Sequence, residues 1–521
     1  MLIGETLECN TEKYGNRLAM VDESGNRLTW SAFNARVNKL AHALLDRGIK
    51  KGDRVAMVSE NCNQYAEVMF ATSKIGAIMA PLNYRLTEQQ LSLAIDDCQP
   101  KAFFVQNKFH GLINSMQSHL KSVESYVGLG AGHGYSYDYE SLIIPYSEHD
   151  PQVDLNEDDA HMIVFSTGTT GSSKGVAITH RQRILGALGT AMNMAISLDE
   201  IVLIGQPLFV IGGQAWLFAA FIKGAASAIH AFSGKSFAEM IEKEKVTSFS
   251  VSPARYQIIR EYLDTCGRSY DFGSVRYLRI SGGQPCPSKK LKEIADYFKI
   301  YDVGKLYGMT EVPSGGTCLL PEEAAPALRP GATEKEIRRL DSVGKPTFFN
   351  RLRIVGENDQ DLPPGKIGEV LLKGDLVNTR CYWNHPELNE RAFKNGWFYT
   401  SDLGFLDEDG FFYFVERKDS MIKSGGFFVA AKEVEKVILQ HPAVSEVAVV
   451  GIPDDRWGQM VKAAVVLKHG QSVSEEDLKT HCRKYLARYQ VPKSMRFVPQ
   501  IPKEPTYGKI LMPQLKQLLH S

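Results

Sequence analysis

The alternation of helical and strand-like patterns along the first third of the chain constrains the fold most strongly. Residues 31–48 place apolar side chains at spacings of three and four, which is the pattern of one helix face. Residues 54–59 then form a short apolar run typical of a buried strand. Strands that alternate with helices predict β-α-β units and a parallel sheet. The same alternation predicts further helices near 65–76 and 87–97 and strands at 78–80 and 102–105.

Two later regions have a different texture. Between residues 351 and 414, alternating apolar runs are broken by turn signals such as Pro363-Pro364-Gly365 and Asp409-Gly410, which predicts an antiparallel, barrel-like section. The last hundred residues carry helical and strand-like patterns of their own. At roughly 100–200 residues per domain, a chain of 521 residues is expected to hold more than one domain. We therefore predict a large α/β domain over 1–418 and a small α+β domain over 419–521.

Charge and hydropathy exclude several functional classes. The 60 Lys and Arg balance the 60 Asp and Glu, which argues against a nucleic-acid partner and a polybasic membrane arm. The longest apolar stretch, 207–222, is interrupted by Gly212-Gly213-Gln214 and is shorter than the roughly 20 residues of a membrane helix. The first ten residues carry two glutamates and no basic residue, unlike a secretory signal. The eight cysteines are scattered without a CxxC pair, which is typical of reduced thiols. We expect a cytoplasmic enzyme without an integral membrane segment.

One segment has the composition of a phosphate-binding loop. The apolar run Met162–Phe165 leads into Ser166-Thr167-Gly168-Thr169-Thr170-Gly171-Ser172-Ser173-Lys174-Gly175. Backbone N–H groups, hydroxyls and one cation are the groups that hold a polyphosphate. The segment is not a Walker P-loop, because that motif needs Gly-Lys-Ser/Thr and a following helix, whereas a strand pattern follows here. Composition alone leaves a flexible surface hairpin as an equal alternative.

The order of residues in this loop closely resembles the phosphate loop of the acyl-adenylate-forming superfamily, which includes acyl-CoA synthetases, peptide-synthetase adenylation domains and firefly luciferase. Further blocks resemble that family in the same order, so the resemblance extends from about residue 10 to about residue 515. It implies two β-α-β layered subdomains and a distorted β-barrel in the large domain, with a small mobile α+β domain after them. The further blocks are Pro207–Phe209, Ser281–Pro285, Tyr307–Glu311, Trp397–Asp402, Arg417–Gly426 and Pro505–Ile510.

The resemblance implies an ATP-dependent ligase that adenylates a carboxylic acid and transfers the acyl group to CoA. Thr310 would hydrogen-bond the α-phosphate, and Glu311 would hold Mg²⁺, a hard cation that prefers oxygen ligands. Asp402 would accept hydrogen bonds from both ribose hydroxyls, and Arg417 would reach the ribose or a phosphate. The loop residues expected around the β- and γ-phosphates are Ser166, Thr167, Gly168, Thr169, Thr170, Gly171 and Lys174. Those expected along the rest of the nucleotide are Gly283, Gln284, Pro285, Tyr307, Gly308 and Met309.

Lys509 is the strongest catalytic candidate. When a carboxylate attacks the α-phosphate, two anions approach each other, and a lysine that reaches both lowers the repulsion and positions the pair. By resemblance, Asp419 would be the hinge about which the small domain turns between the adenylation and thioester steps. The loop of Lys423, Gly425 and Gly426 would then enter the site, where glycines allow close approach of CoA and Lys423 assists thiol attack.

Several positions depart from the family pattern: Phe427-Phe428 and Ala430-Ala431 replace the usual polar-then-proline run after Gly425-Gly426, and three more departures concern the acid and nucleotide sites. Val210 stands where many acyl-CoA and aryl-CoA ligases have a histidine and amino-acid-activating relatives have an aspartate, so a mechanism that needs an imidazole is in doubt and an α-amino acid substrate is not expected. Lys305 replaces a common amide residue near adenine, so either backbone carbonyls serve there or Lys305 points away. Ser401 replaces a common glycine.

The expected substrate pocket is apolar with one amide, which favours an acid with an uncharged aliphatic or aromatic tail. Fatty, cyclic and aryl acids are all compatible with this pocket as substrates, and with a fatty acid substrate the enzyme would act in fatty acid metabolism. The oligomeric state is not determined by the sequence. Two alternatives also remain: a stand-alone adenylating enzyme that loads a carrier protein, and an inactive nucleotide-binding relative, against which the retained Lys509, Glu311 and Asp402 argue. The predicted pocket residues are Val210, Ile211, Trp216, Gln284, Leu306 and Met309.

Overall fold

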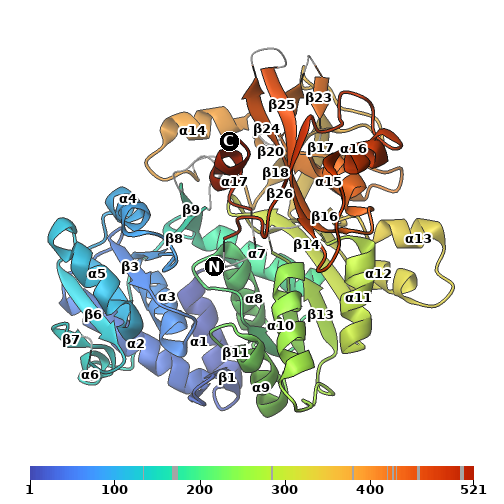
Figure 1. Ribbon diagram of the computed structural model, residues 1–521. Coiled ribbons are helices and arrows are strands. Elements are labelled where there is room, and N and C mark those ends of the chain that lie inside the picture. Colours follow the sequence, from blue (N-terminus) through green and yellow to red (C-terminus); the bar gives the residue numbers. More distant parts are fainter. Residues whose placement is uncertain are drawn as a thin grey trace. The chain divides into compact units, whose positions relative to one another are not determined.

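The computed structural model (Figure 1) describes residues 1–521 apart from 133, 167–173, 283–285, 378–380, 419–420, 425–426, 430, 455–457, 505–507, 509 and 521. The chain forms two compact units. Unit 1 comprises residues 1–282, 286–352 and 372–398, and unit 2 comprises residues 353–371 and 399–521 together with 283–285.

A seven-stranded sheet organises the first part of unit 1. Its order is β7-β6-β5-β3-β4-β8-β9, and neighbouring strands run parallel except for the antiparallel pair β8–β9. The predicted β-α-β units are therefore confirmed. The strands are β3 (Arg54–Val58), β4 (Ile78–Pro81), β5 (Ala102–Gln106), β6 (Ser125–Leu129), β7 (Tyr137–Asp138), β8 (Ala160–Phe165) and β9 (Gly175–Thr179). The helices are α1 (Ile3–Tyr14), α2 (Trp30–Asp46), α3 (Asn63–Ile75), α4 (Glu88–Cys98), α5 (His110–Met116) and α6 (Tyr139–Ile143).

Helices cover both faces of this sheet, which explains why its strands are apolar along their whole length. In β3, Val55 and Met57 join a core cluster that includes side chains of α2 and α3. Ala56 and Val58 point the other way, into a cluster with side chains of α4 and α5. Successive side chains of a strand face opposite sides, so a sheet covered twice needs apolar residues at every position.

A nine-stranded sheet forms the second layer, in the order β16-β15-β14-β13-β12-β10-β11-β1-β2. The six central strands, β14, β13, β12, β10, β11 and β1, pair in parallel. The edge strands β2, β15 and β16 pair antiparallel. The strands are β1 (Leu18–Asp22), β2 (Arg27–Thr29), β10 (Ile201–Ile204), β11 (Ala226–Ile229), β12 (Ser248–Val251), β13 (Tyr277–Ile280), β14 (Val303–Met309), β15 (Val312–Leu319) and β16 (Lys345–Pro346). The helices are α7 (His180–Asn193), α8 (Ile211–Ile222), α9 (Gly234–Glu244), α10 (Pro253–Thr265), α11 (Ser288–Phe298), α12 (Pro321–Leu328) and α13 (Glu334–Arg339). The next helix along the chain, α14 (Pro386–Ala392), contacts β19 (Phe393–Lys394), which belongs to a third sheet.

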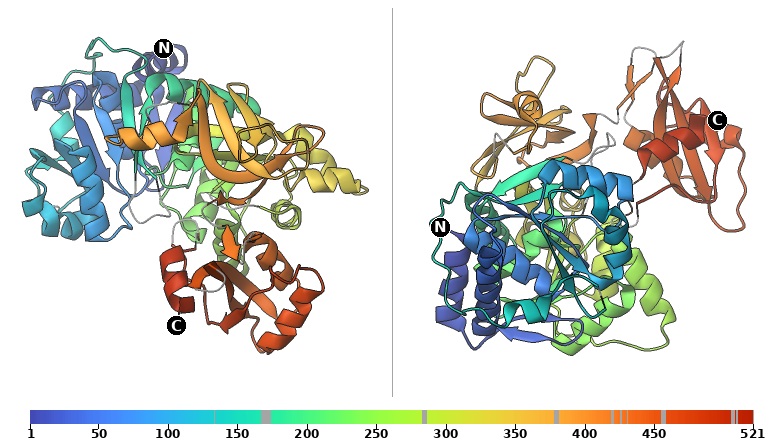
Figure 2. Two further views of the ribbon diagram at one scale, coloured as in Figure 1. Left: turned by 90° about the horizontal axis from the view of Figure 1, so that it is seen from above. Right: turned by 90° about the vertical axis from the view of Figure 1, so that its left-hand side faces the viewer.

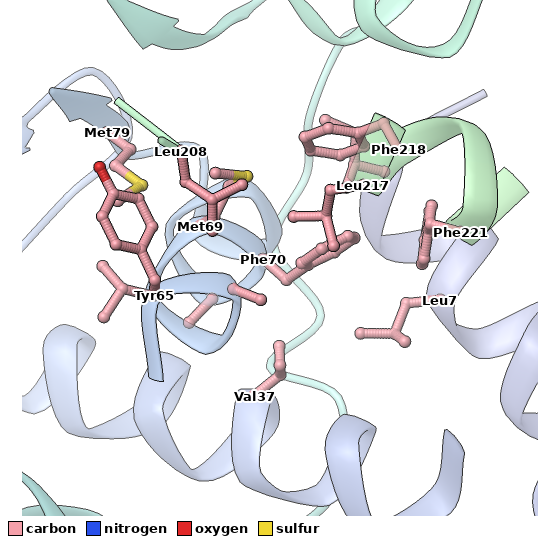
Figure 3. Close-up of a cluster of buried hydrophobic side chains, with 14 of the residues drawn as sticks. Leu7, Val37, Tyr65, Met69, Phe70, Met79, Leu208, Leu217, Phe218 and Phe221 are labelled. Carbon is pink, nitrogen blue, oxygen red and sulfur yellow. The ribbon is translucent and has the colours of Figure 1, made fainter. Parts of the chain in front are cut away.

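The two sheets share a helical layer and a single large core. Helix α3 contacts β4 of one sheet and β1 of the other, and α7 contacts β9 and β15 in the same way. Figure 3 shows Phe70 of α3 beside Phe218 and Phe221 of α8, with ring centroids 5.3 and 4.5 Å from that of Phe70. Burial of such aromatic side chains, at about 25 cal/mol per Å² of apolar surface, is the main force that holds the layers together.

The region predicted to be barrel-like forms a five-stranded sheet with the order β17-β18-β20-β19 and β21 paired with β20. The antiparallel pairing of β20 with β19 and β21 agrees with the predicted antiparallel texture, while closure into a distorted barrel stays a prediction. The strands are β17 (Asn350–Val355), β18 (Gly368–Gly374), β19 (Phe393–Lys394), β20 (Trp397–Leu406) and β21 (Phe412–Arg417).

The C-terminal part of unit 2, orange to red in Figure 2, is a mixed sheet with helices on both faces, as expected of a small α+β fold. Val447 and Val449 face the cluster of α15 and α16, whereas Ala448 and Val450 face that of α17. None of the helices in the described parts of the chain has the length and apolar content needed to cross a membrane. The elements are β22 (Ile422–Ser424), β23 (Phe427–Val429), α15 (Ala431–Leu439), β24 (Val444–Asp454), β25 (Gly458–Leu467), α16 (Glu475–Arg483), β26 (Ser494–Phe497) and α17 (Met512–His520).

Candidate active site

The predicted phosphate loop joins the antiparallel strands β8 and β9. The strands end at the pair Phe165–Gly175, and the backbone N–H of Ser166 donates to the carbonyl of Lys174 at 2.9 Å. The base of a hairpin is thus closed, with Ser166 and Lys174 at its two ends. Residues 167–173, which hold five of the predicted phosphate contacts, lie outside the described residues.

Residues 381–383, which are about 200 positions further along the sequence, pair with the edge of β9. The N–H of Ala177 donates to the carbonyl of Cys381 at 2.6 Å, and the N–H of Trp383 donates to the carbonyl of Gly175 at 2.9 Å. Between them, Tyr382 pairs with Val176. This pairing places the Tyr382 ring next to the end of the phosphate loop, with the Lys174 Nζ atom 5.8 Å from the ring centroid.

Glu311 lies in the tight turn between β14 and β15, directly after Thr310. Its Oε1 atom accepts a hydrogen bond of 2.8 Å from the phenol of Tyr382. The ammonium of Lys174, at the end of the loop before β9, and a carboxylate from the β14–β15 turn therefore meet on the same tyrosine. The structure thus brings together two residues that the sequence placed at the phosphates and at the metal.

The β14–β15 hairpin is built for close approach of its strands. A Cβ atom on Gly308 would lie 2.8 Å from the Cα atom of Gly315, so a side chain at Gly308 would force the strands apart. Tyr307 and Met309, on either side, pack against a cluster that contains Val312 and Leu372. The Tyr307 side chain is half-buried.

Lys305, which replaces a common amide residue, directs its side chain to backbone carbonyls of the protein. Its ammonium is buried and donates to the backbone carbonyls of Cys286 at 3.0 Å and Leu340 at 2.7 Å. Burial lowers the pKa of Lys305 to about 8. The lysine thus ties β14 to the residue that follows the 283–285 segment and to the end of α13.

The predicted acid pocket begins where β10 ends. Asn61 holds this turn, because its side chain donates to the carbonyl of Gln206 at 2.8 Å and accepts from the N–H of Leu208 at 2.9 Å. Val210 follows as the N-cap residue of α8. Val210, Ile211, Leu306 and Met309 are half-buried, whereas Trp216 is only 2% exposed and belongs to the core; Gln284 lies outside the described residues.

A buried polar chain beneath this turn was not predicted. Arg183 of α7 donates to Gln214 Oε1 of α8 at 2.6 Å and to His161 Nε2 at 3.2 Å. Gln214 in turn donates to the carbonyl of Leu208 at 2.8 Å. Burial lowers the pKa of Arg183 to about 9 and the pKa of His161 well below its usual value, so His161 is a neutral acceptor. The signal in the sequence was an amide, Gln214, inside an otherwise apolar helix.

In unit 2, Asp402 and Arg417 lie opposite each other on β20 and β21. The Asp402 Oδ1 atom is 2.9 Å from Arg417 Nη1, and the Asp402 side chain is 5% exposed while that of Arg417 is 42% exposed. The N–H of Asp402 donates to Thr400 Oγ1 at 3.0 Å, which fixes the local backbone. Ser401 between them has φ of 59°, the left-handed conformation that explains why glycine is common at this position.

The remaining predicted site residues are in part beyond what the structure describes. Lys423 lies in the short strand β22, and its backbone pairs with that of Phe428 in β23. No group of three or more His, Cys, Asp or Glu side chains within the described residues is arranged to hold a metal. The predicted residues outside the described ones are Thr167, Gly168, Thr169, Thr170, Gly171, Gly283, Gln284, Pro285, Asp419, Gly425, Gly426 and Lys509.

Comparison with known protein families gives two matches. The AMP-binding enzyme family matches residues 7–383, and the AMP-binding enzyme C-terminal domain matches residues 433–507. The first match alone covers more than half of the chain and contains Lys174, Glu311 and Tyr382.

Comparison with individual proteins gives relatives that align over almost their whole length. A long-chain-fatty-acid–CoA ligase of Mycobacterium tuberculosis is 31% identical, covering 94% of this chain and 93% of the relative. A 2-succinylbenzoate–CoA ligase of Geobacillus sp. is 33% identical, with 96% and 95% covered. A fatty acid–[acyl-carrier-protein] ligase of Streptomyces coeruleorubidus is 31% identical, with 94% and 92% covered.

Among solved structures, the o-succinylbenzoate coenzyme A synthetase of Bacillus subtilis in complex with ATP and magnesium ion superimposes with a TM-score of 0.82. It is 27% identical, and the match covers 98% of this chain and 99% of that chain. The fold seen here, a large α/β part followed by a small α+β part, is therefore that of a known CoA synthetase.

Proposed function

The chain belongs to the AMP-binding enzyme family, and from that premise we propose that this acid–thiol ligase joins a carboxylic acid to CoA through an acyl-adenylate. In the first step a carboxylate oxygen attacks the α-phosphorus of ATP, and pyrophosphate leaves. In the second step the thiol of CoA attacks the acyl carbon, the thioester forms and AMP is released.

The convergence of Lys174 and Glu311 on Tyr382 carries the proposal. The Lys174 ammonium lies near the ring of Tyr382, and the Glu311 carboxylate is bonded to its hydroxyl. A cation and a carboxylate are the groups needed to hold a triphosphate and its counter-ion. A single carboxylate suits Mg²⁺, which keeps several waters and binds through one or two carboxylates plus substrate phosphates. Bound there, Mg²⁺ would neutralise phosphate charge. Thr310, next to Glu311, would then donate to the α-phosphate.

The other nucleotide contacts follow from the same assignment. Asp402 would accept from the ribose hydroxyls, and Arg417, which is ion-paired with Asp402, would reach the ribose or a phosphate. Tyr307 would flank the adenine beside 283–285. Lys509 would bring the carboxylate and the α-phosphate together.

We assign the two steps to two arrangements of the domains 1–418 and 419–521, with the hinge at Asp419. In the second arrangement, the loop of Lys423, Gly425 and Gly426 would enter the site and accept the CoA arm. The match of a separate C-terminal family domain to residues 433–507 supports a boundary in this part of the chain.

The substrate is proposed to be an acid with an uncharged fatty, cyclic or aryl tail. Val210 at the start of α8 supplies neither an imidazole nor a carboxylate, and Ile211, Leu306 and Met309 are apolar and half-buried. Such a wall offers no partner to a substrate ammonium, which would be costly to bury unpaired.

A second acceptor is supported by one of the relatives. The Streptomyces coeruleorubidus protein is named a ligase of fatty acids to acyl-carrier protein, and it aligns over 94% of this chain. The acyl-adenylate could accordingly be transferred to the thiol of a carrier protein instead of to free CoA.

The test is a mass balance with a panel of fatty, cyclic and aryl acids. Pyrophosphate release, AMP formation and acyl thioester are measured with CoA and, separately, with a holo-carrier protein. Thioester with CoA supports the first candidate, thioester only with the carrier supports the second, and no pyrophosphate with any acid refutes both. Lys509→Ala is expected to abolish pyrophosphate release. Lys503→Ala, in the same segment and ion-paired with Glu446, is the matched control.

A further inference from the structure

Tyr382 contacts both charged residues of the proposed phosphate site, and it lies outside the sequence blocks on which the resemblance was recognised. We propose that Tyr382 is a positioning residue: its phenol orients the Glu311 carboxylate for Mg²⁺, and its ring supports the Lys174 ammonium. The inference rests on the proposed function, because it takes Glu311 as the metal-binding residue and Lys174 as a phosphate-binding residue.

The hydrogen bond sets the orientation of the carboxylate. The phenol carries one hydrogen, which is directed at Glu311 Oε1 over 2.8 Å. A carboxylate held through one oxygen cannot rotate freely, so Oε2 becomes the oxygen offered to a cation. Partners of this kind, which orient a metal-binding side chain, typically change metal affinity or activity by about 10–100-fold when they are removed.

The position of the phenol is itself fixed by the backbone. Tyr382 lies between Cys381 and Trp383, whose backbone groups bond to Ala177 and Gly175 of β9. The tyrosine is therefore attached to the strand that ends the phosphate loop, while its hydroxyl reaches the turn of the other sheet. It links the two halves of the proposed site, and the backbone bonds on either side of Tyr382 hold this side chain in place against β9.

The ring makes a separate contribution to Lys174. At 5.8 Å from the ring centroid, the ammonium is within the range of a cation–π interaction, which is worth about 0.5–1 kcal/mol at exposed sites. Burial raises the pKa of the neighbouring Cys381 thiol well above its usual value, and the Glu311 charge adds to this effect. Hydroxyl and ring thus have distinct roles that two substitutions can separate.

The experiment measures ATP binding by calorimetry in the absence of the acid, once with Mg²⁺ and once with EDTA. The readout is the factor by which Mg²⁺ tightens ATP binding. Tyr382→Phe keeps the ring, so we expect unchanged affinity in EDTA and a Mg²⁺ factor lowered about tenfold or more. Tyr382→Leu removes the ring as well, so ATP binding is expected to weaken in EDTA too. Tyr382→His restores a ring with a donor and is expected to recover part of the factor.

Three controls make the outcome decisive. Tyr399→Phe removes a phenol that donates to the unrelated Asp359 at 2.9 Å, and it should change neither measurement. In a Glu311→Gln background, Tyr382→Phe should have no further effect on the Mg²⁺ factor. The thermal unfolding midpoint of each variant, measured without ATP, shows that the variant is folded.

An unchanged or increased Mg²⁺ factor in Tyr382→Phe would overturn the positioning role, and so would an equal further loss in the Glu311→Gln background. Failure of the proposed function looks different, because the unmodified protein would then bind no ATP or form no adenylate with any acid.

Discussion

The Asp402 carboxylate lies 2.9 Å from the Arg417 guanidinium across the antiparallel pair β20–β21, with the aspartate buried and the arginine half open to solvent. Arg417 thus places an opposite charge beside a buried carboxylate. The pair therefore presents a carboxylate acceptor at the position proposed for the ribose.

Replacing Asp402 by asparagine should weaken ATP binding. Asparagine keeps the size of the side chain but loses the charge, and hydrogen bonds to a charged group contribute about 1.5–3 kcal/mol. We expect the Kd for ATP to rise about tenfold or more. Calorimetry with ATP measures the effect, and Asp359→Asn, at another carboxylate of unit 2 that accepts from Tyr399, should leave the Kd unchanged. Equal affinities of the Asp402 variant and the unmodified protein would remove Asp402 from the ribose site.

Lys305 should make stability depend on alkaline pH in a specific direction. Its pKa is about 8 in the folded chain and about 10.4 when unfolded, so between these values the unfolded state binds more protons. The cost of the buried ammonium is present below pH 8 and disappears as the pH rises toward 10. The melting midpoint of the protein minus that of Lys305→Met should therefore increase between pH 7 and pH 9.5. The control is Lys289→Met, at an exposed lysine, for which the difference in melting midpoint from the unmodified protein should not change with pH. A difference for Lys305→Met that does not change with pH would contradict the buried-ammonium interpretation.

The Arg183–Gln214 contact should matter for stability. Gln214→Leu leaves the buried guanidinium without its 2.6 Å acceptor, so we expect a loss of about 1.5–3 kcal/mol of unfolding free energy. Gln214→Glu keeps an acceptor for Arg183 and should lose less. Thermal unfolding midpoints of the two variants measure the difference. If the Gln214→Leu and Gln214→Glu variants had the same unfolding midpoint, the hydrogen bond would not be important for holding α7 to α8.

Ser401→Gly should stabilise the protein slightly. A left-handed backbone costs a non-glycine residue about 1–2 kcal/mol. Part of the gain is offset because glycine loses about 0.5–1 kcal/mol more than alanine on folding. The melting midpoint should rise by about one degree, measured by thermal unfolding. Ser445→Gly, in β24 and outside the positive-φ residues, should instead lower it. A lower midpoint for Ser401→Gly would mean that the hydroxyl makes a stabilising contact.

Much of the fold was accessible from local patterns. The helix and strand periods before residue 106 predicted α2, β3, α3, β4, α4 and β5 in order, because strand and helix periods are properties of neighbouring residues. The loop of glycine, serine and threonine residues at 166–173 was also recognisable, because its composition is a property of neighbouring residues. The hairpin β1–β2 was not predicted, although it joins the nine-stranded sheet beside β11, about 200 residues further along the chain.

The sequence by itself determined the family, the succession of a large α/β part and a small α+β part, and the types of chemical group available for a phosphate site. Only the tertiary structure decided which of these residues meet. Tyr382 reaches Glu311 across 71 positions, Lys305 turns to two backbone carbonyls, and Gln214 finds Arg183. Periodicity reports the face on which a side chain lies, whereas such pairings depend on how sheets and helices pack, and packing brings together residues that share no local pattern.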